Sequence, residues 1–261
     1  MTDSVLCEID GAVAIVTLNR PAARNALTAE TKTALLTVLR SCAADGALRA
    51  VIFTGAGQAF CAGQDLREHA GLLESGADPL DTVREHYNPI VTAITGMGKP
   101  VIAAVNGVAA GAGAALAFAC DFRIAAQGAS FLMAFARVGL GADSGASWTL
   151  QRLAGSAVAA ELLMLAEPVR SDRALSLGLV TAVVADDELP GAARGLAARL
   201  AAGPTAAYAA IKESLLFAAS HSLSESLAKE AELQQQLGRT RDHREATQSF
   251  VRKQEPAFEG R

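Results

Sequence analysis

The amino-acid sequence predicts one α/β fold with a mostly parallel sheet, followed by a helical C-terminal third. Hydrophobic residues make up 51% and charged residues 19% of the 261 positions, so the chain can bury a large core. Apolar stretches of strand length alternate with helical patterns in the first half, which is typical of strand–helix–strand units with right-handed crossovers. From about Gly145 onward the pattern is helical, and only residues 180–184 interrupt it as a strand.

Turn and capping residues mark the first elements. Residues 5–9 and 12–18 are apolar and flank Asp10-Gly11, so we expect a β-hairpin. Thr28 can accept hydrogen bonds from the first N–H groups of a helix that extends to about residue 42. A short apolar strand follows at 50–54. The apolar face of the expected helix consists of Leu35, Leu36, Leu39 and Cys42.

The middle of the chain combines further strands with one polar interruption. The stretch from about 68 to 81 contains glycine and charged residues and is expected to form a mobile loop. Residues 81–95 are expected to be helical, and residues 100–105 and 122–126 to form buried strands. Later helix boundaries are marked by Ser171, Pro204, the capping box Ser222-x-x-Glu225 and Gly238.

Composition argues against several classes of function. The formal net charge of −4 and the pI of about 5.6 disfavour a nucleic-acid binder, which normally carries a basic surface. The four cysteines contain no Cys-x-x-Cys pair, so neither a zinc site nor a disulfide framework is predicted, and a reducing compartment fits. The N-terminus shows no signal-peptide pattern, and the Ala- and Gly-rich stretch 101–120 is a poor membrane span. We therefore expect a soluble, cytoplasmic protein without a bound metal.

The first glycine-rich segment, residues 60–66, reads Phe-Cys-Ala-Gly-Gln-Asp-Leu. It follows a strand and the turn at 55–57, so it should lie at the carboxyl edge of the sheet, where open α/β folds bind ligands. Ala62 and Gly63 allow a ligand to approach the backbone, and Asp65 can cap a following helix. A plain strand-to-helix turn is the alternative explanation for these residues.

The second glycine-rich segment, residues 106–115, follows a strand and opens a helix. A helix N-terminus presents unpaired N–H donors and a positive dipole end, which suit an anion or a developing oxyanion. Nucleotide-binding motifs do not fit, because no Gly-x-x-x-x-Gly-Lys-Ser/Thr run exists and Leu116 stands where a dinucleotide turn needs Gly or Ala. Close helix packing through small residues is the alternative explanation.

In this order and separation, the two segments resemble those of the crotonase (enoyl-CoA hydratase/isomerase) superfamily. Further matches extend the resemblance over almost the whole chain: Leu18-Asn19-Arg20-Pro21, Asn25-Ala26-Leu27, Phe250-x-x-Lys253, Pro256 and Phe258. The resemblance implies a spiral of ββα units with a C-terminal helical trimerisation region, assembled as a homotrimer or a dimer of trimers. Residues 1–195 would form the spiral core with the CoA and acyl site, and residues 196–261 would serve oligomerisation and cover the active site.

The same resemblance implies an oxyanion hole formed by two backbone N–H groups, which fall on Gln64 and Ala112. The family often has glycine at the second position, but alanine offers the same N–H. Coenzyme A is expected only as part of the substrate thioester, without a permanently bound cofactor. The residues expected to contact the acyl-CoA are Arg24, Ala62, Gly63, Asp65, Gly111, Phe250 and Lys253.

Side chains around the acyl group decide which reaction a superfamily member performs. Its hydratases use two glutamates, and the matching positions here are Ala115 and Phe135, neither of which can transfer a proton. Asp143 instead matches the acid/base carboxylate of several isomerases, including dienoyl-CoA isomerases and ring 1,2-epoxyphenylacetyl-CoA isomerases. The resemblance is strongest to the latter, although Ala142 stands where these relatives commonly have proline. The motifs that carry it include Tyr87-Asn88-Pro89 and Phe131-x-Met133-Ala134-Phe135.

We therefore expect an acyl-CoA isomerase in which the hole stabilises an enolate and Asp143 acts as general acid/base, its pKa raised by apolar surroundings. A role of Asp143 as a helix N-cap is the alternative for this residue. An enoyl-CoA hydratase or a Δ3,Δ2-enoyl-CoA isomerase of fatty-acid oxidation remains open as a function. So does a non-catalytic scaffold or RNA-binding homologue. Glu68 and His69 rank lower, because they are expected to face solvent from a loop.

Overall fold

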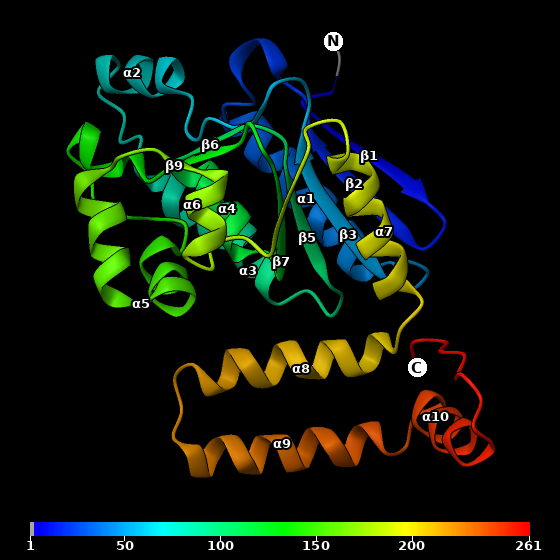
Figure 1. Ribbon diagram of the computed structural model, residues 1–261. Helices are drawn as coiled ribbons and strands as arrows, with labels where there is room; N and C mark the ends of the chain where they lie inside the picture. Colours follow the sequence, from blue (N-terminus) through cyan, green and yellow to red (C-terminus); the bar gives the residue numbers. More distant parts are fainter. Residues whose placement is uncertain (1–2) are drawn as a thin grey trace.

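Two β-sheets lie at the centre of the computed structural model, which describes residues 3–261 (Figure 1). A six-stranded sheet has the order β1-β2-β3-β5-β7-β10, and a four-stranded sheet has the order β4-β6-β8-β9. The strands of the first are β1 (Val5–Asp10), β2 (Val13–Leu18), β3 (Ala50–Gly55), β5 (Val101–Val105), β7 (Phe122–Ala126) and β10 (Ala182–Val184). Those of the second are β4 (Ala59–Cys61), β6 (Val108–Ala110), β8 (Ser130–Leu132) and β9 (Val169–Arg170).

The six-stranded sheet is parallel except for its first hairpin. β1 and β2 pair antiparallel across Gly11, whose φ of +58° favours glycine, and the predicted hairpin is confirmed. The other neighbours, from β2 to β10, all pair in parallel, as the alternation of strands and helices predicts. β5 is buried along its whole length, which explains its uninterrupted apolar sequence. The carboxyl ends of β3 and β5 lead into the two glycine-rich segments.

Helices cover both faces of this sheet. In Figure 1, α7 crosses in front of the sheet, and α1 lies behind it. α1 begins after Thr28, whose Oγ1 accepts a hydrogen bond from the Thr31 N–H at 3.2 Å, and this confirms the predicted cap. The α-helices are α1 (Ala29–Ala44), α2 (Leu66–Glu74), α3 (Asn88–Thr95), α4 (Ala112–Ala119), α5 (Ala146–Leu165), α6 (Ser171–Ser176), α7 (Leu189–Ala201), α8 (Thr205–Ala218), α9 (Leu223–Leu237) and α10 (Arg241–Arg252).

The prediction of a loop over residues 68–81 is wrong for the first half of this stretch, which lies in α2. Asp65 caps this helix: its carboxylate accepts hydrogen bonds from the N–H groups of Arg67 at 3.1 Å and Glu68 at 3.4 Å. A charged, glycine-containing sequence therefore becomes helical once its N-terminus is capped.

The predicted helix at 81–95 is confirmed, but it contains one π-helical turn, η2 (Val83–Tyr87), before α3. Two short 3₁₀ turns, η1 (Pro21–Ala23) and η3 (Ala134–Val138), complete the helical elements. The four-stranded sheet has no counterpart in the prediction. Its strands contain only two or three residues, which is too few for an alternating pattern to show.

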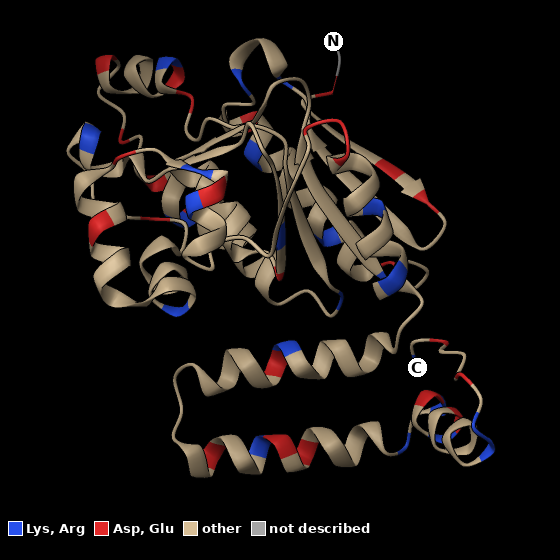
Figure 2. Ribbon diagram, viewed as in Figure 1, with Lys and Arg blue, Asp and Glu red and all other residues tan. Residues whose placement is uncertain are grey.

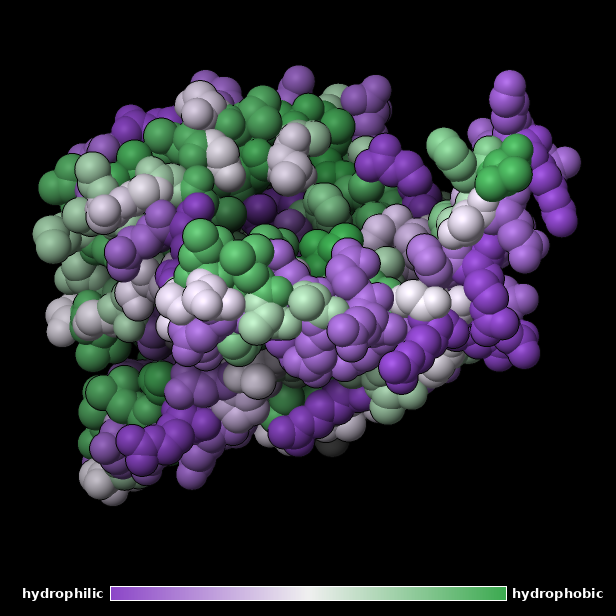
Figure 3. Space-filling view, turned by 90° about the horizontal axis from the view of Figure 1, so that it is seen from below, coloured by the Kyte–Doolittle hydropathy of each residue, from purple (hydrophilic) through white to green (hydrophobic). Residues whose placement is uncertain are grey.

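α8 and α9 form an antiparallel pair below the sheets, and α10 follows beside them (Figure 1). The predicted capping box at the start of α9 is confirmed by hydrogen bonds in both directions between Ser222 and Glu225. Charged residues are spread along α9 (Figure 2), and apolar groups alternate with hydrophilic ones on the side seen from below (Figure 3). The exposed apolar residues of the pair include Ile211, Leu215, Leu216, Leu223 and Leu227. Over residues 3–261, no helix is long and apolar enough to cross a membrane.

Candidate acyl-thioester site

The two glycine-rich segments lie against each other beyond β3 and β5. A Cβ atom added at Gly63 would lie 2.7 Å from the carbonyl oxygen of Ala110 and 3.5 Å from the amide nitrogen of Ala112. One added at Gly113 would overlap the carbonyl oxygen of Cys61. Gly63 also has a φ of +85°, a conformation that favours glycine. The glycines therefore allow the backbones of the two segments to approach closely.

A buried asparagine holds the start of the first segment. The Asn25 side chain is fully buried, and its Nδ2 donates to the carbonyl oxygens of Ala56, Ala59 and Phe60 at 3.0, 2.7 and 3.2 Å. Its Oδ1 accepts a hydrogen bond from the Arg20 N–H at 2.9 Å. Asn25 has a φ of +56°, which asparagine tolerates better than most residues. This side chain shapes the turn that carries the first segment.

The backbone around Gln64 is fixed with its own N–H unpaired. The Leu27 N–H donates to the Gly63 carbonyl at 2.8 Å, and the Asp65 N–H donates to the Leu27 carbonyl at 3.1 Å, forming an isolated parallel bridge. Successive peptide groups of extended backbone point to opposite sides, so the Gln64 N–H points away from Leu27. Within the described part of the chain this N–H donates to no other group. It is available to a ligand oxygen.

The second donor begins α4. Ala112 is the first residue of this helix, and it follows Gly111, which has a φ of +50°. The first N–H groups of a helix have no acceptor within it, and no side chain caps this end of α4. The helix dipole adds a partial positive charge there. Because Gly63 lies beside the Ala112 nitrogen, the N–H groups of Gln64 and Ala112 can together bind one carbonyl oxygen.

A buried network holds the side chain of Gln64. Its Oε1 accepts hydrogen bonds from the Tyr87 hydroxyl at 2.6 Å and the Lys32 ammonium at 3.0 Å. The Lys32 ammonium also donates to Thr82 Oγ1 and lies 5.0 Å from the centroid of the Tyr87 ring. The sequence pattern did not single out Lys32, although its spacing of three residues from Leu35 places it on the apolar face of α1. The presence of a lysine on the apolar face of this helix is the sequence feature from which its role could have been predicted.

Asp143 is half-buried in the loop before α5. Burial raises the pKa of its carboxyl group, and the hydrogen bond from the Ser144 hydroxyl at 2.7 Å and the charge of Lys32 oppose this rise. Burial, followed by the charges of Cys61, Asp143 and others, also raises the pKa of Tyr87. Asp143 is therefore close enough for its charge to act on Lys32 and Tyr87, the two residues that hold Gln64.

The alternative role of Asp143 as a helix cap is not observed. The N-cap of α5 is Gly145, and no side chain caps the helix. Only the backbone carbonyl of Asp143 takes part in the turn, as the acceptor for the Ala146 N–H at 2.9 Å. The carboxylate retains one oxygen without a hydrogen bond from the described residues, so it can exchange a proton with a ligand.

The two positions that carry glutamate in hydratases of the resembled superfamily are apolar and buried here. Ala115 lies in α4 and is 0% exposed, and Phe135 lies in η3 and is 7% exposed. Neither side chain can hold or activate a water molecule. Asp143, from the loop before α5, is near enough for its charge to act on Lys32 of the Gln64 side-chain network, as are Glu68 and Asp65.

The structure brings some of the predicted ligand contacts together and separates others. Ala62 is next to the hole, and its N–H donates to the carbonyl of Arg24 at 3.0 Å, while the Arg24 side chain is exposed. Asp65 forms an ion pair with Arg20 at 3.0 Å. Burial would raise the pKa of Asp65, but this partner and two backbone N–H groups outweigh it and lower the pKa.

Phe250 and Lys253 belong to the end of α10, and Figure 1 shows this helix at the opposite end of the molecule from α2. Phe250 is 85% exposed. These two residues are therefore not close to Gln64 and Ala112 within one chain.

The expectation that Glu68 and His69 face solvent is wrong, because α2 turns both of them partly inward. Glu68 accepts hydrogen bonds from the Ala29 N–H at 3.0 and 3.2 Å and so links α2 to the start of α1. The Nδ1 atom of His69 is buried, with no hydrogen-bond partner among residues 3–261.

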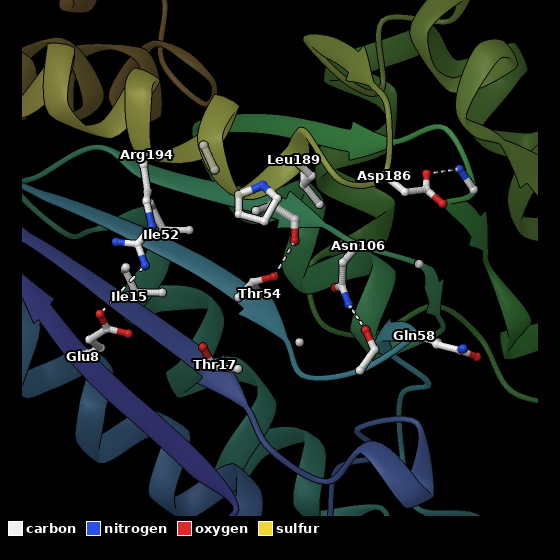
Figure 4. Close-up of a pocket in the computed structure, with 17 residues that line it drawn as sticks. Glu8, Ile15, Thr17, Ile52, Thr54, Gln58, Asn106, Asp186, Leu189 and Arg194 are labelled. Atoms are coloured by element: carbon white, nitrogen blue, oxygen red, sulfur yellow. Dashed lines mark hydrogen bonds and ion pairs between the residues drawn. The ribbon is translucent and has the colours of Figure 1, made fainter.

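A separate cavity of about 690 Å³ lies between α7 and the six-stranded sheet (Figure 4). Arg194 reaches from α7 toward Glu8 at 3.8 Å, and Asn106 Nδ2 donates to the carbonyl of Gly57 at 2.8 Å. The residues of the candidate hole and Asp143 do not line this cavity. In the described range of the chain, no cluster of His, Cys, Asp or Glu could hold a metal ion.

Comparisons with known proteins decide the family. The family model described as enoyl-CoA hydratase/isomerase matches residues 8–261. The chain belongs to this enoyl-CoA hydratase/isomerase family. A crystal structure described as an enoyl-CoA hydratase/isomerase of Mycobacterium abscessus matches with a TM-score of 0.94 and 43% identity, covering 98% of this chain and 100% of that one. The predicted crotonase-like α/β fold is therefore confirmed.

Relatives within the enoyl-CoA hydratase/isomerase family carry different reaction names. A protein of Rhodobacter capsulatus named as a probable enoyl-CoA hydratase is 43% identical over 254 residues, covering 97% of each chain. The 1,2-epoxyphenylacetyl-CoA isomerase of Escherichia coli is 38% identical over 262 residues, covering 100% of each chain. The family identifies an enzyme acting on CoA thioesters, and the side chains at the site must distinguish hydration from isomerisation.

Proposed function

We propose that the protein is an acyl-CoA isomerase that stabilises an enolate in the hole formed by the Gln64 and Ala112 N–H groups. The observation that carries this proposal is which positions around the hole hold a carboxyl group. Ala115 and Phe135 are apolar and buried, whereas Asp143 is a half-buried carboxyl group whose charge acts on the residues that hold Gln64. One such carboxyl group can remove and return a proton, but the two glutamates that hydratases of the family use are absent from these positions.

The proposed reaction begins with the thioester carbonyl oxygen accepting hydrogen bonds from the two backbone N–H groups. The Asp143 carboxylate removes a proton from the carbon next to the thioester, and the electrons of that C–H bond move onto the carbonyl oxygen. Two preorganised donors stabilise the resulting negative charge, and losing one such donor costs about 3 kcal/mol in other enzymes. The raised pKa of Asp143 suits it to take the proton and then to return it.

The acyl group determines the second half of the reaction. In an alkenoyl substrate the proton returns farther along the chain and the double bond moves. In an epoxide substrate, the ring opens instead. The 38% identity over the full length of the Escherichia coli 1,2-epoxyphenylacetyl-CoA isomerase supports the epoxide of an aromatic acyl-CoA as the first substrate to test.

The C-terminal region is assigned to assembly and to the coenzyme. α8 and α9 expose several large apolar side chains, which suits residues 196–261 to contact other subunits of a homotrimer or a dimer of trimers. In such an assembly, Phe250 and Lys253 would reach the CoA of a neighbouring subunit, and Arg24 would bind phosphate from within the chain. Analytical ultracentrifugation tests the assembly directly.

The decisive experiment replaces Asp143 by Asn and measures conversion of 1,2-epoxyphenylacetyl-CoA and of a 3-enoyl-CoA to isomers of unchanged mass. Turnover should fall by about 100-fold or more, because proton transfer by a positioned side chain contributes that much. Asp186→Asn is the matched control, since this exposed aspartate only accepts a hydrogen bond from the Gly128 N–H at 2.9 Å. Unchanged turnover in Asp143→Asn would eliminate the assignment.

Hydration remains the second candidate, because the relative from Rhodobacter capsulatus bears a hydratase name. Loss of the absorbance of crotonyl-CoA on incubation with the wild-type protein would reveal it, and the expected result is no loss. Absence of acyl-CoA binding by calorimetry would instead favour a non-catalytic scaffold.

A further inference from the structure

We propose that Lys32 is a positioning residue of this site, which holds Gln64 in place and acts on Asp143 through its charge. This inference rests on the proposed function, since it concerns the same hole and the same carboxylate. Lys32 is neither one of the two proposed backbone donors nor the proposed base, and its ammonium group is bound to Gln64 and Thr82, so its effect would pass through Gln64 and Asp143.

The first support is the geometry around the ammonium group. Lys32 is only 1% exposed, yet its Nζ donates to Gln64 Oε1 at 3.0 Å and to Thr82 Oγ1. The Tyr87 ring lies 5.0 Å away, within the range of a cation–π interaction. These contacts replace water around a charge that would otherwise be costly to bury.

The second support is the place where this network ends. Gln64 Oε1 receives both the Lys32 ammonium and the Tyr87 hydroxyl, at 3.0 and 2.6 Å. The backbone on either side of Gln64 is bound to Leu27, so backbone and side chain of this residue are each fixed by hydrogen bonds. The direction in which its N–H points is therefore fixed, and a hydrogen-bond donor of an oxyanion hole requires such a fixed direction.

The third support is the set of charged and titratable groups around Lys32. Burial lowers the pKa of Lys32, and the carboxylates of Glu68, Asp143 and Asp65 oppose this by favouring its charged form. In return, the Lys32 charge counteracts the burial that raises the pKa of Asp143. The groups that face this cluster come from α1, β4, α2 and its N-cap, η2 and the loop before α5. They are Lys32, Cys61, Asp65, Glu68, Tyr87, Asp143 and, through Thr82, His86.

A purely structural role does not explain this residue. An apolar side chain of similar length would pack on the apolar face of α1 without the cost of burying an ammonium group. Departures from local rules of this kind are expected at functional sites. Lys99 offers the contrast, because it is also buried but donates only to backbone carbonyls at the end of α1, those of Cys42, Ala43 and Asp45.

The test uses phenylacetyl-CoA labelled with deuterium at the carbon next to the thioester. Loss of deuterium to solvent, followed by mass spectrometry, reports removal of that proton whichever product forms later. Wild type, Lys32→Met and the control Lys99→Met are compared from pH 5 to 9, with circular dichroism to verify folding. If Lys32→Met does not fold, Lys32→Gln, which also lacks the charge, is measured in its place.

We expect kcat/KM of Lys32→Met to fall by about 10- to 100-fold, the effect of a misplaced group at a catalytic site. The acid limb of its pH profile should move to higher pH, because Asp143 loses a positive charge that opposes the rise of its pKa. Lys99→Met should retain the wild-type profile even if it unfolds at a lower temperature. In the pair Lys32→Met and Gln64→Leu, the losses in the double variant should overlap rather than add.

The outcomes separate this inference from the proposed function. A folded Lys32→Met or Lys32→Gln with the wild-type rate and acid limb would overturn the role of Lys32, while inactive Asp143→Asn would leave the function intact. An active Asp143→Asn would overturn the function whatever Lys32 does. Additive losses in the double variant would refute the path through Gln64.

Discussion

Replacing Gly63 by alanine should disable the hole while leaving every side chain of the site in place. The added Cβ would lie 2.7 Å from the Ala110 carbonyl oxygen, closer than real Cβ atoms approach, so the two segments must separate by several tenths of an ångström. The φ of +85° adds to this, since left-handed backbone costs an alanine about 1–2 kcal/mol. Both effects act on the peptide that carries the Gln64 N–H.

The expected magnitude follows from losing one of two donors. Removal of an oxyanion-hole donor costs about 3 kcal/mol of transition-state stabilisation, so kcat should fall by about 100-fold. The free energy of unfolding should fall by at least about 1–2 kcal/mol, the cost of the backbone conformation alone. The deuterium-loss assay measures the first quantity, and urea unfolding measures the second.

Gly71→Ala supplies the matched control. Gly71 lies in α2, close in sequence to the same segment, and a Cβ atom there would meet no other atom within 4 Å. This variant should keep the wild-type rate and gain about 0.5–1 kcal/mol of stability, because alanine favours helix over glycine. A folded Gly63→Ala protein whose kcat stays within about twofold of wild type would refute the reasoning, since losing a donor should cost far more.

Two further predictions concern stability. Burial raises the pKa of Asp143 in the folded protein, so folding favours its protonated form. The stability that this protonated form contributes is lost as the pH rises above the ordinary range of aspartate. Asp143→Asn should therefore melt at a higher temperature than wild type at pH 7, and the difference should shrink at pH 4 in scanning calorimetry; a lower melting temperature at pH 7 would contradict this. Asn25→Ala should lose about 3 kcal/mol or more in urea unfolding, because several buried carbonyls lose their donor. A loss below about 1 kcal/mol would mean that water replaces the amide.

Much of the six-stranded sheet could be predicted because its signals are local. A turn dipeptide marks Gly11, a side-chain cap marks Thr28, and β5 is a continuous apolar run. The four-stranded sheet escaped because its short strands form only when distant segments meet, as Val108–Ala110 does with Ala59–Cys61. Tertiary pairing, not a repeating pattern, defines those strands.

The candidate site also has one part that could be predicted from the sequence and one part that could not. The glycine segments could be found in the sequence because close approach of backbones restricts residue type, as at Gly63 and Gly113. The network behind the hole could not, because Lys32, Gln64 and Tyr87 are far apart in the sequence and meet only in the folded chain. A long polar side chain can also point in several directions, so residue type alone does not reveal which acceptor it reaches.

Gln64 is placed like a residue on the edge of a sheet. One side of its short extended backbone pairs with Leu27, and the other side presents an N–H as an unpaired edge strand does. A thioester carbonyl that binds there occupies the place where the carbonyl of an additional strand would lie. Such pairing depends on the main chain, so in the proposed function alanine at position 112 would serve as well as glycine. On that proposal, holding the thioester needs only main-chain donors, whereas the reaction is set by a carboxylate such as Asp143.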